Sequence, residues 1–418
     1  MSGRRMLIYS HDTFGIGNIR RTIELSMAMS RRLPDLSILL ITGSSVADAF
    51  EIPSNVEYVK LPALRREGRQ DYRARAVGFD VNHVRKMRIE ICRAAVRYFS
   101  PDMVVVDKAP FGVDGELSPA LASLRHRRPD CIRILALRDI LDAGKVVSAD
   151  WAQRCVGQAI ARHYDAVWVF GSPSLFDVAH EYQLPPEVRD KVRYVGWMAR
   201  NAAPRDPADV RQSLGLQDGP ILLVTAGGGD DGDLLLSTFA RIIDQLEHVE
   251  SKLSTVIVSG PQAKPELRKS LAKICAGRAR RRFCEFTTDL VSLINAADGV
   301  LSMGGYNTTC EILWLNKRAL IVPRTQPVQE QLVRAERLAA LGAVRMCRPE
   351  ELSPGRLLAE TRIILREFVP RLLDPIRFPF DALERASAAA ASMLDSTARR
   401  THTCLTGSPE LCPSCSTP

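Results

Sequence analysis

Glycines and polar side chains that could bind a ligand are concentrated in the sequence SMGGYNTTCE, residues 302–311. Residues 299–302 have the character of a buried strand and residues 307–315 have helical spacing, which places Gly304–Gly305 in a tight strand-to-helix turn. Glycine lets the main chain approach a ligand closely, and the first turn of a helix favours anionic oxygens. Glu311, about one turn into the helix, can accept two hydrogen bonds from vicinal hydroxyls such as those of a ribose. These features indicate a nucleotide-sugar pocket; the alternative is a glycine-rich loop that only turns a corner in an α/β domain.

Two further glycine clusters follow strand-like runs. In HDTFGIGN, residues 11–18, Gly15 and Gly17 mark the loop between the first strand and a helix, but the third glycine of a dinucleotide fingerprint is absent. The second cluster, AGGGDDG at residues 226–232, opens the second half of the chain in the same way. Its glycines, Gly228 among them, allow backbone amides to line a phosphate, although the two aspartates would repel phosphate unless they point away.

Several acidic or basic side chains near the predicted strand ends could act as a general base. His11 and Asp12 lie in the first loop, and Asp107 follows a strand at the same edge of the sheet. Asp139 is a weaker fourth candidate. Each could deprotonate an acceptor hydroxyl, and the sequence leaves open which one does so, or whether all four are structural.

Length and composition describe a globular protein of more than one domain. The chain has 418 residues, of which 46% are hydrophobic and 25% are charged, with a net charge of +9. No apolar run approaches the roughly 18 to 20 residues of a membrane span, and the first residues lack the apolar region of a signal peptide. The ten cysteines are scattered, several of them within apolar segments, which favours reduced thiols. We therefore expect a cytoplasmic protein.

The positive charge is concentrated between Lys60 and Arg97, where eleven Lys or Arg accompany four Asp or Glu. Part of this segment has helical spacing, and its predicted apolar stripe is Val84, Met87, Ile91, Ala94 and Tyr98. Its basic residues form either the solvated face of a packed helix or a patch for an anionic membrane surface or a phosphorylated acceptor. We expect no nucleic-acid partner, because the segment lacks an aromatic stacking pattern.

Strand-like apolar runs alternate with helical stretches, as in parallel sheets built from βαβ units. The expected strands are residues 6–9, 37–41, 103–106, 132–137 and 166–169, then 221–225, 255–259, 282–286, 299–302 and 319–323. A break with two prolines at residues 201–207 separates the two sets. We predict an α/β protein of two Rossmann-like, doubly wound domains, residues 1–200 and 208–370.

The C-terminal segment is expected to hold one helix and a tail. We assign residues 371–398 to a helix that returns to the N-terminal domain and residues 399–418 to a flexible tail. Four potential metal ligands lie in that tail: His402, Cys404, Cys412 and Cys415. A Cys-x-x-Cys pair is half of a zinc site, but little nearby apolar sequence could fold around a metal, so a reducible tail without metal is the favoured interpretation.

The order of these motifs resembles the GT-B glycosyltransferases, whose two domains face a cleft. The motifs follow one another as they do in that family: a GxG loop, a glycine-rich loop opening a second domain, SMGGYNTTCE, the sequence VPR at residues 322–324 and the cluster at residues 329–331. The resemblance is most specific from Phe286 to Leu341. The chain is similar to the family of the peptidoglycan glycosyltransferase that moves N-acetylglucosamine from UDP to a lipid-linked acceptor, with a family 28-like C-terminal domain. The resemblance implies a UDP-sugar as co-substrate.

The resemblance also implies roles for individual residues. Those that would hold the diphosphate and ribose are Ser302, Gly304, Gly305, Asn307, Thr308 and Glu311. Phe286 and Thr287 would meet the base. The pair of side chains that contacts the sugar would fall within Gln329, Glu330 and Gln331.

The first loop departs from the family pattern. Relatives commonly carry His directly after the GxG, whereas this chain has Asn18, which takes no proton at neutral pH. A base would therefore have to come from another residue, or the activity is lost. Asp230 and Asp231 are the one acidic pair near the donor loops, and without a DxD-like motif we expect metal-independent chemistry and no cofactor.

Three functions remain open at this stage. The first is transfer of a hexosyl or N-acetylhexosaminyl group from a UDP-sugar to a hydroxyl of a lipid-linked, small-molecule or other amphipathic acceptor by a protein at the membrane periphery, with inversion. The second is hydrolysis of a nucleotide sugar, with water in place of the acceptor. The third is nucleotide-sugar binding without turnover.

Overall fold

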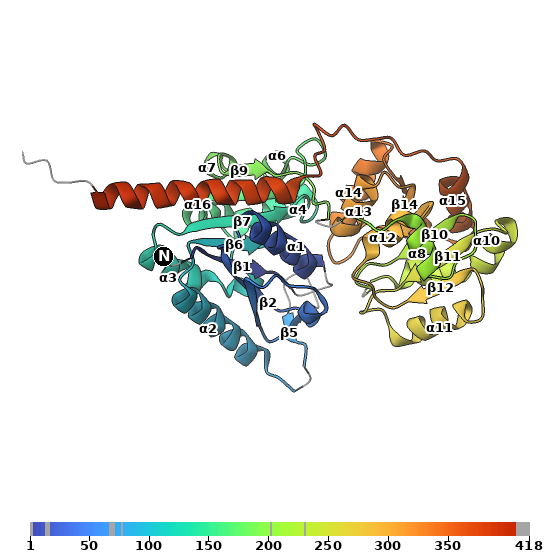
Figure 1. Ribbon diagram of the computed structural model, residues 1–418, viewed down its shortest axis with the longest axis horizontal. Helices are drawn as coiled ribbons and strands as arrows, with labels where there is room; N and C mark the ends of the chain where they lie inside the picture. Colours follow the sequence, from blue (N-terminus) through green and yellow to red (C-terminus); the bar gives the residue numbers. More distant parts are fainter. Residues whose placement is uncertain are drawn as a thin grey trace, which may run out of the picture.

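The computed structural model describes residues 3–12, 17–66, 72–76, 78–200, 203–229 and 231–406, with the side chains of the last helix described to Thr397. The chain folds into two α/β lobes connected near residue 200, and the C-terminal segment crosses back from the second lobe to the first (Figure 1). Gly15 and Asp230, both named above, lie outside the described residues.

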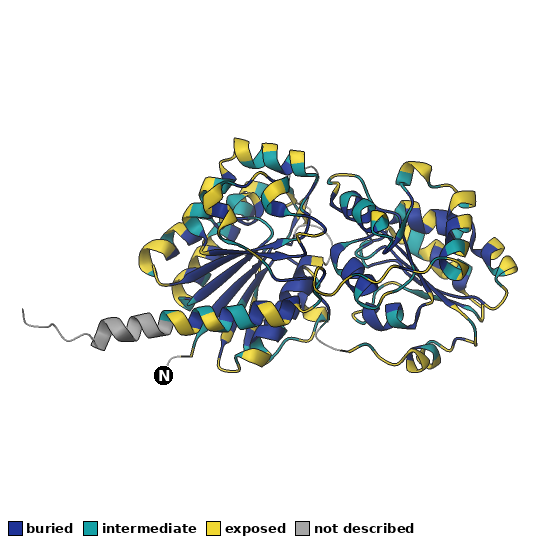
Figure 2. Ribbon diagram, turned by 90° about the horizontal axis from the view of Figure 1, so that it is seen from above, coloured by how far each residue is buried: buried dark blue, intermediate teal, exposed yellow. Residues whose placement is uncertain are grey.

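The N-terminal domain is built on a seven-stranded parallel sheet of order β3-β2-β1-β6-β7-β8-β9. Its strands are β1 (Arg5–Ser10), β2 (Ser37–Thr42), β3 (Val56–Lys60), β6 (Met103–Asp107), β7 (Ile132–Arg138), β8 (Ala166–Phe170) and β9 (Val192–Tyr194), and β4 (Leu64–Arg66) pairs with β5 (Tyr72–Ala74) in a separate hairpin. Its helices are α1 (Gly17–Arg32), α2 (Val81–Phe99), α3 (Ser118–Arg127), α4 (Gly144–Gln153), α5 (Val156–His163), α6 (Val178–Glu181) and α7 (Pro186–Arg189). β6 and β8 are buried along their whole length and mostly apolar, because helices cover both faces of the sheet (Figure 2).

The C-terminal domain repeats this plan with a six-stranded parallel sheet of order β12-β11-β10-β13-β14-β15. Its strands are β10 (Ile221–Thr225), β11 (Ser254–Val258), β12 (Arg281–Cys284), β13 (Gly299–Ser302), β14 (Ala319–Ile321) and β15 (Arg345–Met346). Its helices are α8 (Pro207–Ser213), α9 (Asp233–Ala240), α10 (Ile243–Val249), α11 (Pro265–Cys275), α12 (Leu290–Ala296), α13 (Tyr306–Trp314), α14 (Glu330–Ala340) and α15 (Pro354–Arg366).

Both sheets reverse their strand order at a central strand. In the first sheet the order reverses at β1, which lies between β2 and β6, and in the second it reverses at β10, which lies between β11 and β13. Open parallel sheets bind ligands outside the carboxyl ends of their strands at such reversals. The glycine loops at residues 11–18 and 226–232 follow β1 and β10, so the prediction of two doubly wound domains is confirmed and both loops lie at binding positions.

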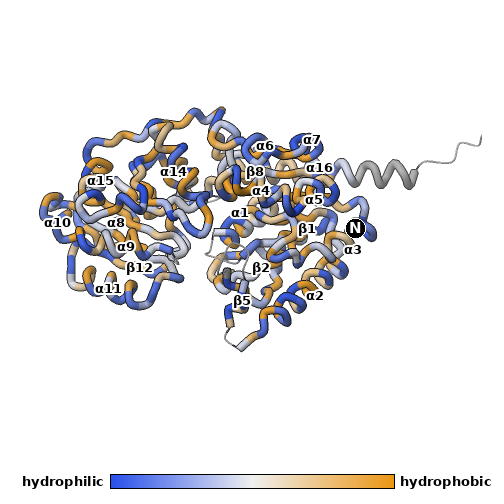
Figure 3. Tube along the Cα trace, turned by 180° about the vertical axis from the view of Figure 1, so that it is seen from behind, coloured by the Kyte–Doolittle hydropathy of each residue, from blue (hydrophilic) through white to orange (hydrophobic). Residues whose placement is uncertain are grey.

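The predicted apolar stripe of α2 was only partly correct, because Val84 is buried and Ile91 is half-buried, but the other three residues are exposed. Met87 and Tyr98 are 49% and 77% exposed, and Ala94 is exposed as well, whereas the residues buried along the helix are Val84, Arg88, Cys92 and Val96. Arg88 can face the core because its guanidinium pairs with both oxygens of Glu116, at 2.5 and 2.6 Å. Figure 3 shows hydrophilic and hydrophobic residues alternating along α2.

The C-terminal helix differs from its predicted bounds. α16 spans Ala382–Thr406, so residues 371–381 form a connecting segment and residues 399–406, expected in the tail, are helical. Small residues, Ala382, Ala386 and Ala390, are fully buried where α16 packs against α1. Cys412 and Cys415 lie outside the described residues, as do the side chains of His402 and Cys404. In the described part of the chain, none of the helices has the length and apolar character needed to cross a membrane.

Candidate functional site

A cavity of 340 Å³ lies between the two domains, at the carboxyl ends of both sheets. It brings together most of the residues predicted from the sequence. The predicted residues that line it are His11, Gly17, Asn18, Gly228, Phe286, Thr287, Ser302, Gly305, Asn307, Thr308, Glu330 and Gln331. Six other predicted residues are described but do not line it: Asp12, Asp107, Asp139, Gly304, Glu311 and Gln329.

The wall from the C-terminal domain is formed by the start of α13 and the loop after β10. Gly305 is the residue immediately before α13, and a Cβ atom added to it would meet no atom within 4 Å, so its backbone borders open space. The amide of Gly304, which has a φ of 76°, donates to the Ser302 hydroxyl over 3.2 Å and fixes the turn. The main-chain amides in the first turn of α13 have no partner within the helix, which suits this wall to an anionic group.

The two domains touch at this wall. The Asn307 side chain donates to the carbonyl oxygen of Gly17 over 3.0 Å, which joins the start of α13 to the start of α1. Two helix N-termini from different domains therefore meet at one side of the cavity.

A polar network around Asn18 joins the start of α1 to His11. The Asn18 amide donates to the His11 carbonyl, and its oxygen accepts from Arg21 over 3.3 Å. Arg21 also forms an ion pair with Asp107, whose other oxygen accepts from the His11 amide over 3.4 Å. Asn18, which departs from the family pattern, thus fixes the main chain of the His11 loop rather than carrying a proton.

The four candidate bases are placed very differently. His11 lines the cavity, whereas Asp107 is paired with Arg21 and Asp139 with Arg334. Asp12 accepts a hydrogen bond from Thr42 over 2.6 Å, and burial raises its pKa. Of the four, only His11 is presented to the cavity.

Glu311 is turned toward the N-terminal domain and the interdomain connection. One of its oxygens, Oε1, accepts from Arg20 of α1 and, over 2.8 Å, from Arg200. Arg200 also pairs with Glu24 over 3.0 Å and donates to the Thr288 carbonyl. Burial raises the pKa of Glu311, which the charge of Arg20 partly offsets. Glu311 does not line the cavity, so its contact with a ribose stays a prediction from the sequence.

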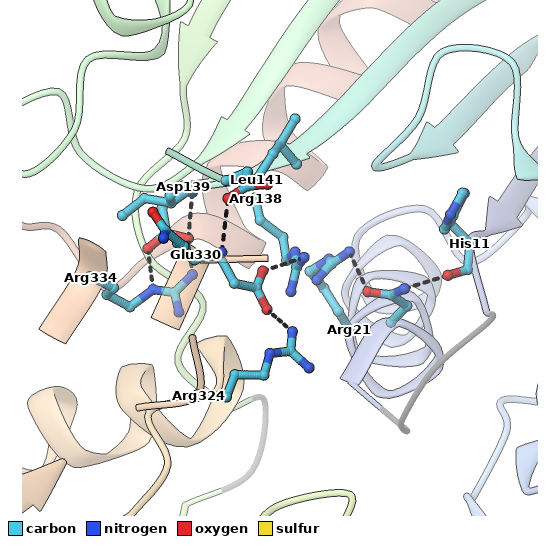
Figure 4. Close-up of polar contacts among 12 residues, drawn as sticks. His11, Arg21, Arg138, Asp139, Leu141, Arg324, Glu330 and Arg334 are labelled. Atoms are coloured by element: carbon cyan, nitrogen blue, oxygen red, sulfur yellow. Dashed lines mark hydrogen bonds and ion pairs between the residues drawn. The ribbon is translucent and has the colours of Figure 1, made fainter. Parts of the chain in front are cut away.

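Around Glu330 the cavity holds an ion cluster (Figure 4), whose pairing with Arg138 the sequence did not indicate. Glu330 pairs with Arg138 at 2.5 Å and with Arg324 at 2.6 Å. Arg324 also pairs with Asp231 at 2.8 Å, and its amide donates to the Gln331 side chain over 3.0 Å. Asp231 therefore does not present an unpaired charge to a phosphate, and all four side chains line the cavity together with Gln331.

The wall from the N-terminal domain includes a group of apolar side chains. Its apolar side chains belong to the loop after β6 and to the α4 region: Pro110, Phe111, Leu141, Val146, Val147, Trp151 and Val156. Charges of both signs lie on the same wall: Lys108, Arg154, Asp114, Asp142 and Asp150, of which Arg154 and Asp150 pair at 3.5 Å. Lys108 has a φ of 68°, a costly conformation for a non-glycine residue and one that recurs at functional sites.

The sequence did not predict that arginines and a group of apolar side chains would line the cavity. Arg138 and Glu330 are far apart in the chain, so neither spacing nor composition pairs them. Lys108 offered a partial signal, because it follows Asp107 at the end of a predicted strand. Within the residues that the structure describes, no group of three or more His, Cys, Asp or Glu side chains is arranged to hold a metal ion.

Comparison with known proteins agrees with this architecture. Residues 221–367 match the model of the glycosyltransferase family 28 C-terminal domain. A comparison with curated proteins found no match. Together the fold, the paired glycine loops and the cleft define the GT-B class of structure, which confirms the resemblance noted from the motifs.

Three solved structures illustrate the similarity over the whole chain. The calicheamicin glycosyltransferase CalG4 shares 17% identity at a TM-score of 0.58, covering 96% of this chain and 99% of its own. MurG from Acinetobacter baumannii shares 15% identity at a TM-score of 0.53, and the match covers 93% of this chain and 98% of MurG. A putative UDP-N-acetylglucosamine 2-epimerase from Listeria monocytogenes shares 12% identity at a TM-score of 0.60, and the match covers 95% of this chain and 98% of the epimerase chain. At these identities the similarity shows the fold, and the reaction must be argued from the site.

Proposed function

We propose that the protein transfers a sugar from a UDP-sugar to a hydroxyl of an amphipathic acceptor, lipid-linked or a small molecule, with inversion and without a metal ion. One observation carries this function. A single interdomain cavity joins the start of α13 and the glycine loop of the C-terminal domain to His11 and an apolar wall of the N-terminal domain. The first side suits a nucleotide diphosphate and the second suits a hydroxyl-bearing apolar molecule.

The donor occupies the C-terminal side in this proposal. Phe286 and Thr287 meet the base, the amides at the start of α13 receive the diphosphate, and Glu330 and Gln331 meet the sugar. The match to the family 28 C-terminal domain covers all of these residues, which supports the assignment.

The transfer step uses His11 as the base. The acceptor hydroxyl oxygen forms a bond to the anomeric carbon while the bond from that carbon to the diphosphate breaks, and His11 takes the hydroxyl proton. UDP leaves with its added negative charge next to the start of α13, where helix amides stabilise it. Because fixed dipoles do this work, and Arg324 holds Asp231, the step as proposed requires no metal ion.

We also propose that α2 lets the protein lie on an anionic membrane from the cytoplasmic side. Its exposed face carries Met87 and Tyr98 together with Lys86, Arg93 and Arg97. Exposed apolar side chains among basic residues suit the boundary between lipid headgroups and acyl chains.

Thermal stabilisation and UDP release test the proposed reaction together. A ligand that binds only the folded protein raises its melting temperature, so we expect UDP and one UDP-sugar to do so among a panel of nucleotides. Release of UDP that depends on an added acceptor supports transfer. Release at the same rate without acceptor indicates a hydrolase, and binding without release indicates a binding protein; either result would replace the proposed activity.

A further inference from the structure

The Glu330 carboxylate joins the two domains at the sugar end of the cavity. Its Oε2 atom pairs with Arg138 at 2.5 Å and its Oε1 atom accepts from Arg324 over 2.6 Å. Arg138 is the last residue of β7 in the N-terminal domain, whereas Arg324 follows β14 in the same domain as Glu330. Each oxygen is therefore held by a different domain, as Figure 4 shows.

The cluster keeps Glu330 ionised although its side chain is only 3% exposed. Burial alone would raise the pKa of Glu330, but the charges of Arg138, Arg324 and Arg334 outweigh this effect and lower the pKa to about 2. An ionised carboxylate only accepts hydrogen bonds, which suits it to the hydroxyl groups of a sugar. Because Glu330 lines the cavity beside Gln331, its orientation bears directly on sugar binding.

The two arginines orient Glu330 under different conditions. Arg324 also pairs with Asp231 and belongs to the C-terminal domain, so its contact with Glu330 does not depend on how the domains are arranged. The contact with Arg138 crosses the cleft and exists only when the domains are as close as they are here. Other contacts cross beside it: the Gln329 amide donates to Asp142 over 2.8 Å, and Arg334 pairs with Asp139 at 2.7 Å.

Resting on the function proposed above, we propose that Arg138 is a positioning residue that completes the donor-sugar site across the cleft. It fixes the Glu330 carboxylate, so recognition of the sugar requires the closed arrangement of the domains. Recognition of the nucleotide does not, because the residues assigned to the base and the diphosphate belong to the C-terminal domain. This arrangement brings the acceptor wall and the sugar together before transfer occurs.

Calorimetric titration of UDP and UDP-N-acetylglucosamine, with UDP-glucose as a second donor, tests this role. In Arg138→Gln we expect the affinity for UDP to stay within about 2-fold of the wild type. The sugar's contribution is the ratio of the affinity for the UDP-sugar to the affinity for UDP. We expect this ratio to fall by about 10-fold, which is the effect of one lost charge-assisted contact. Arg138→Lys keeps the positive charge and should recover part of the loss.

Arg337→Gln is the matched control. Arg337 lies on α14, like Glu330, and also forms an ion pair across the domains, with Glu181 at 2.5 Å, but it does not line the cavity. Its removal should leave the ratio of the two affinities unchanged. Glu330→Gln should reproduce the loss seen in Arg138→Gln, and the double variant should add little to it, because the two residues act as one unit.

The outcomes separate the two proposals. Equal weakening of UDP and the UDP-sugar in Arg138→Gln, or an unchanged ratio, would overturn the positioning role while leaving the nucleotide site in place. Fully additive losses in the double variant would also overturn it. If the wild-type protein binds neither ligand, the proposed function itself fails and this role falls with it. Should Arg138→Gln fail to fold, Arg138→Lys and Glu330→Gln give the same comparison.

Discussion

At the scale of single residues, arginines around the cleft pair with carboxylates from distant parts of the chain. Arg21 holds Asp107, Arg20 holds Glu311 and Arg334 holds Asp139 through both oxygens at 2.7 Å. None of these three carboxylates lines the cavity, and each has an oxygen held by its arginine rather than open to an acceptor hydroxyl. The pairs therefore restrict the choice of base and direct attention to His11.

Replacing His11 tests its role as the base. In His11→Gln we expect the rate of acceptor-dependent UDP release to fall by about 100-fold or more, the usual range for loss of a general base. Donor affinity should stay within about 2-fold, because His11 belongs to the acceptor side. Enzymatic UDP detection and titration of UDP would check both expectations, and an undiminished rate would assign the base elsewhere.

The low pKa of Glu330 predicts how its contribution to stability depends on pH. A carboxyl whose pKa is lowered by folding, here to about 2, stabilises the fold above its unfolded pKa near 4.5 and loses this contribution as pH falls toward 2. The free energy of unfolding of wild type minus that of Glu330→Gln should therefore shrink as pH drops from about 5 to 3. Urea denaturation across that range would measure it; a difference that stays constant would contradict the ion cluster.

At the scale of elements, the sequence predicted the central strands, because buried parallel strands are mostly apolar, but it did not predict the edge strands β3, β9 and β15. The predicted run at residues 132–137 corresponds to β7, and the run at residues 221–225 corresponds to β10. The face of α2 was mispredicted because Arg88 occupies a buried position, which only its pairing with Glu116 makes tolerable. The glycine loops at the site could be predicted because they follow strands directly in the sequence. The Arg138–Glu330 pair could not be predicted, because it forms only where the two domains meet.

The exposed face of α2 predicts binding to anionic lipid. Lys86→Gln combined with Arg97→Gln should weaken cosedimentation with vesicles containing phosphatidylglycerol, by about 1 kcal/mol for each charge lost. Lys269→Gln with Lys273→Gln, which removes two exposed charges from α11 in the other domain, is the control and should change little. Equal effects of the two pairs would show that net charge, rather than the α2 face, governs association.

At the scale of the whole molecule, the two domains present the carboxyl ends of their sheets to one cleft and are joined by buried polar contacts. α16 packs against α1 and so returns the end of the chain to the first domain (Figure 1). The Arg334–Asp139 pair is the most buried of the ion pairs between domains, with side chains 2% and 3% exposed. Removing one partner from such a pair leaves a buried charge without compensation.

Asp139→Asn should therefore destabilise the protein strongly, by about 3 kcal/mol or more. The exposed pair of Asp381 with Arg385, at 2.7 Å, provides the control, and Asp381→Asn should cost less than about 1 kcal/mol. Urea denaturation of both variants measures the difference. Similar small losses would mean that the Arg334–Asp139 pair does not hold the domains together.

The most direct test of the account is titration of UDP into wild type, Gly305→Ala and Gly355→Ala. Both glycines have room for a Cβ atom, but Gly305 borders the cavity at the start of α13, whereas Gly355 lies in α15 away from it. We predict one UDP site in the wild type, at least about 10-fold weaker binding in Gly305→Ala, where the methyl group stands in the place of the diphosphate, and unchanged binding in Gly355→Ala. No UDP binding by the wild type, or equal binding by all three proteins, would contradict a nucleotide-sugar site in the cleft.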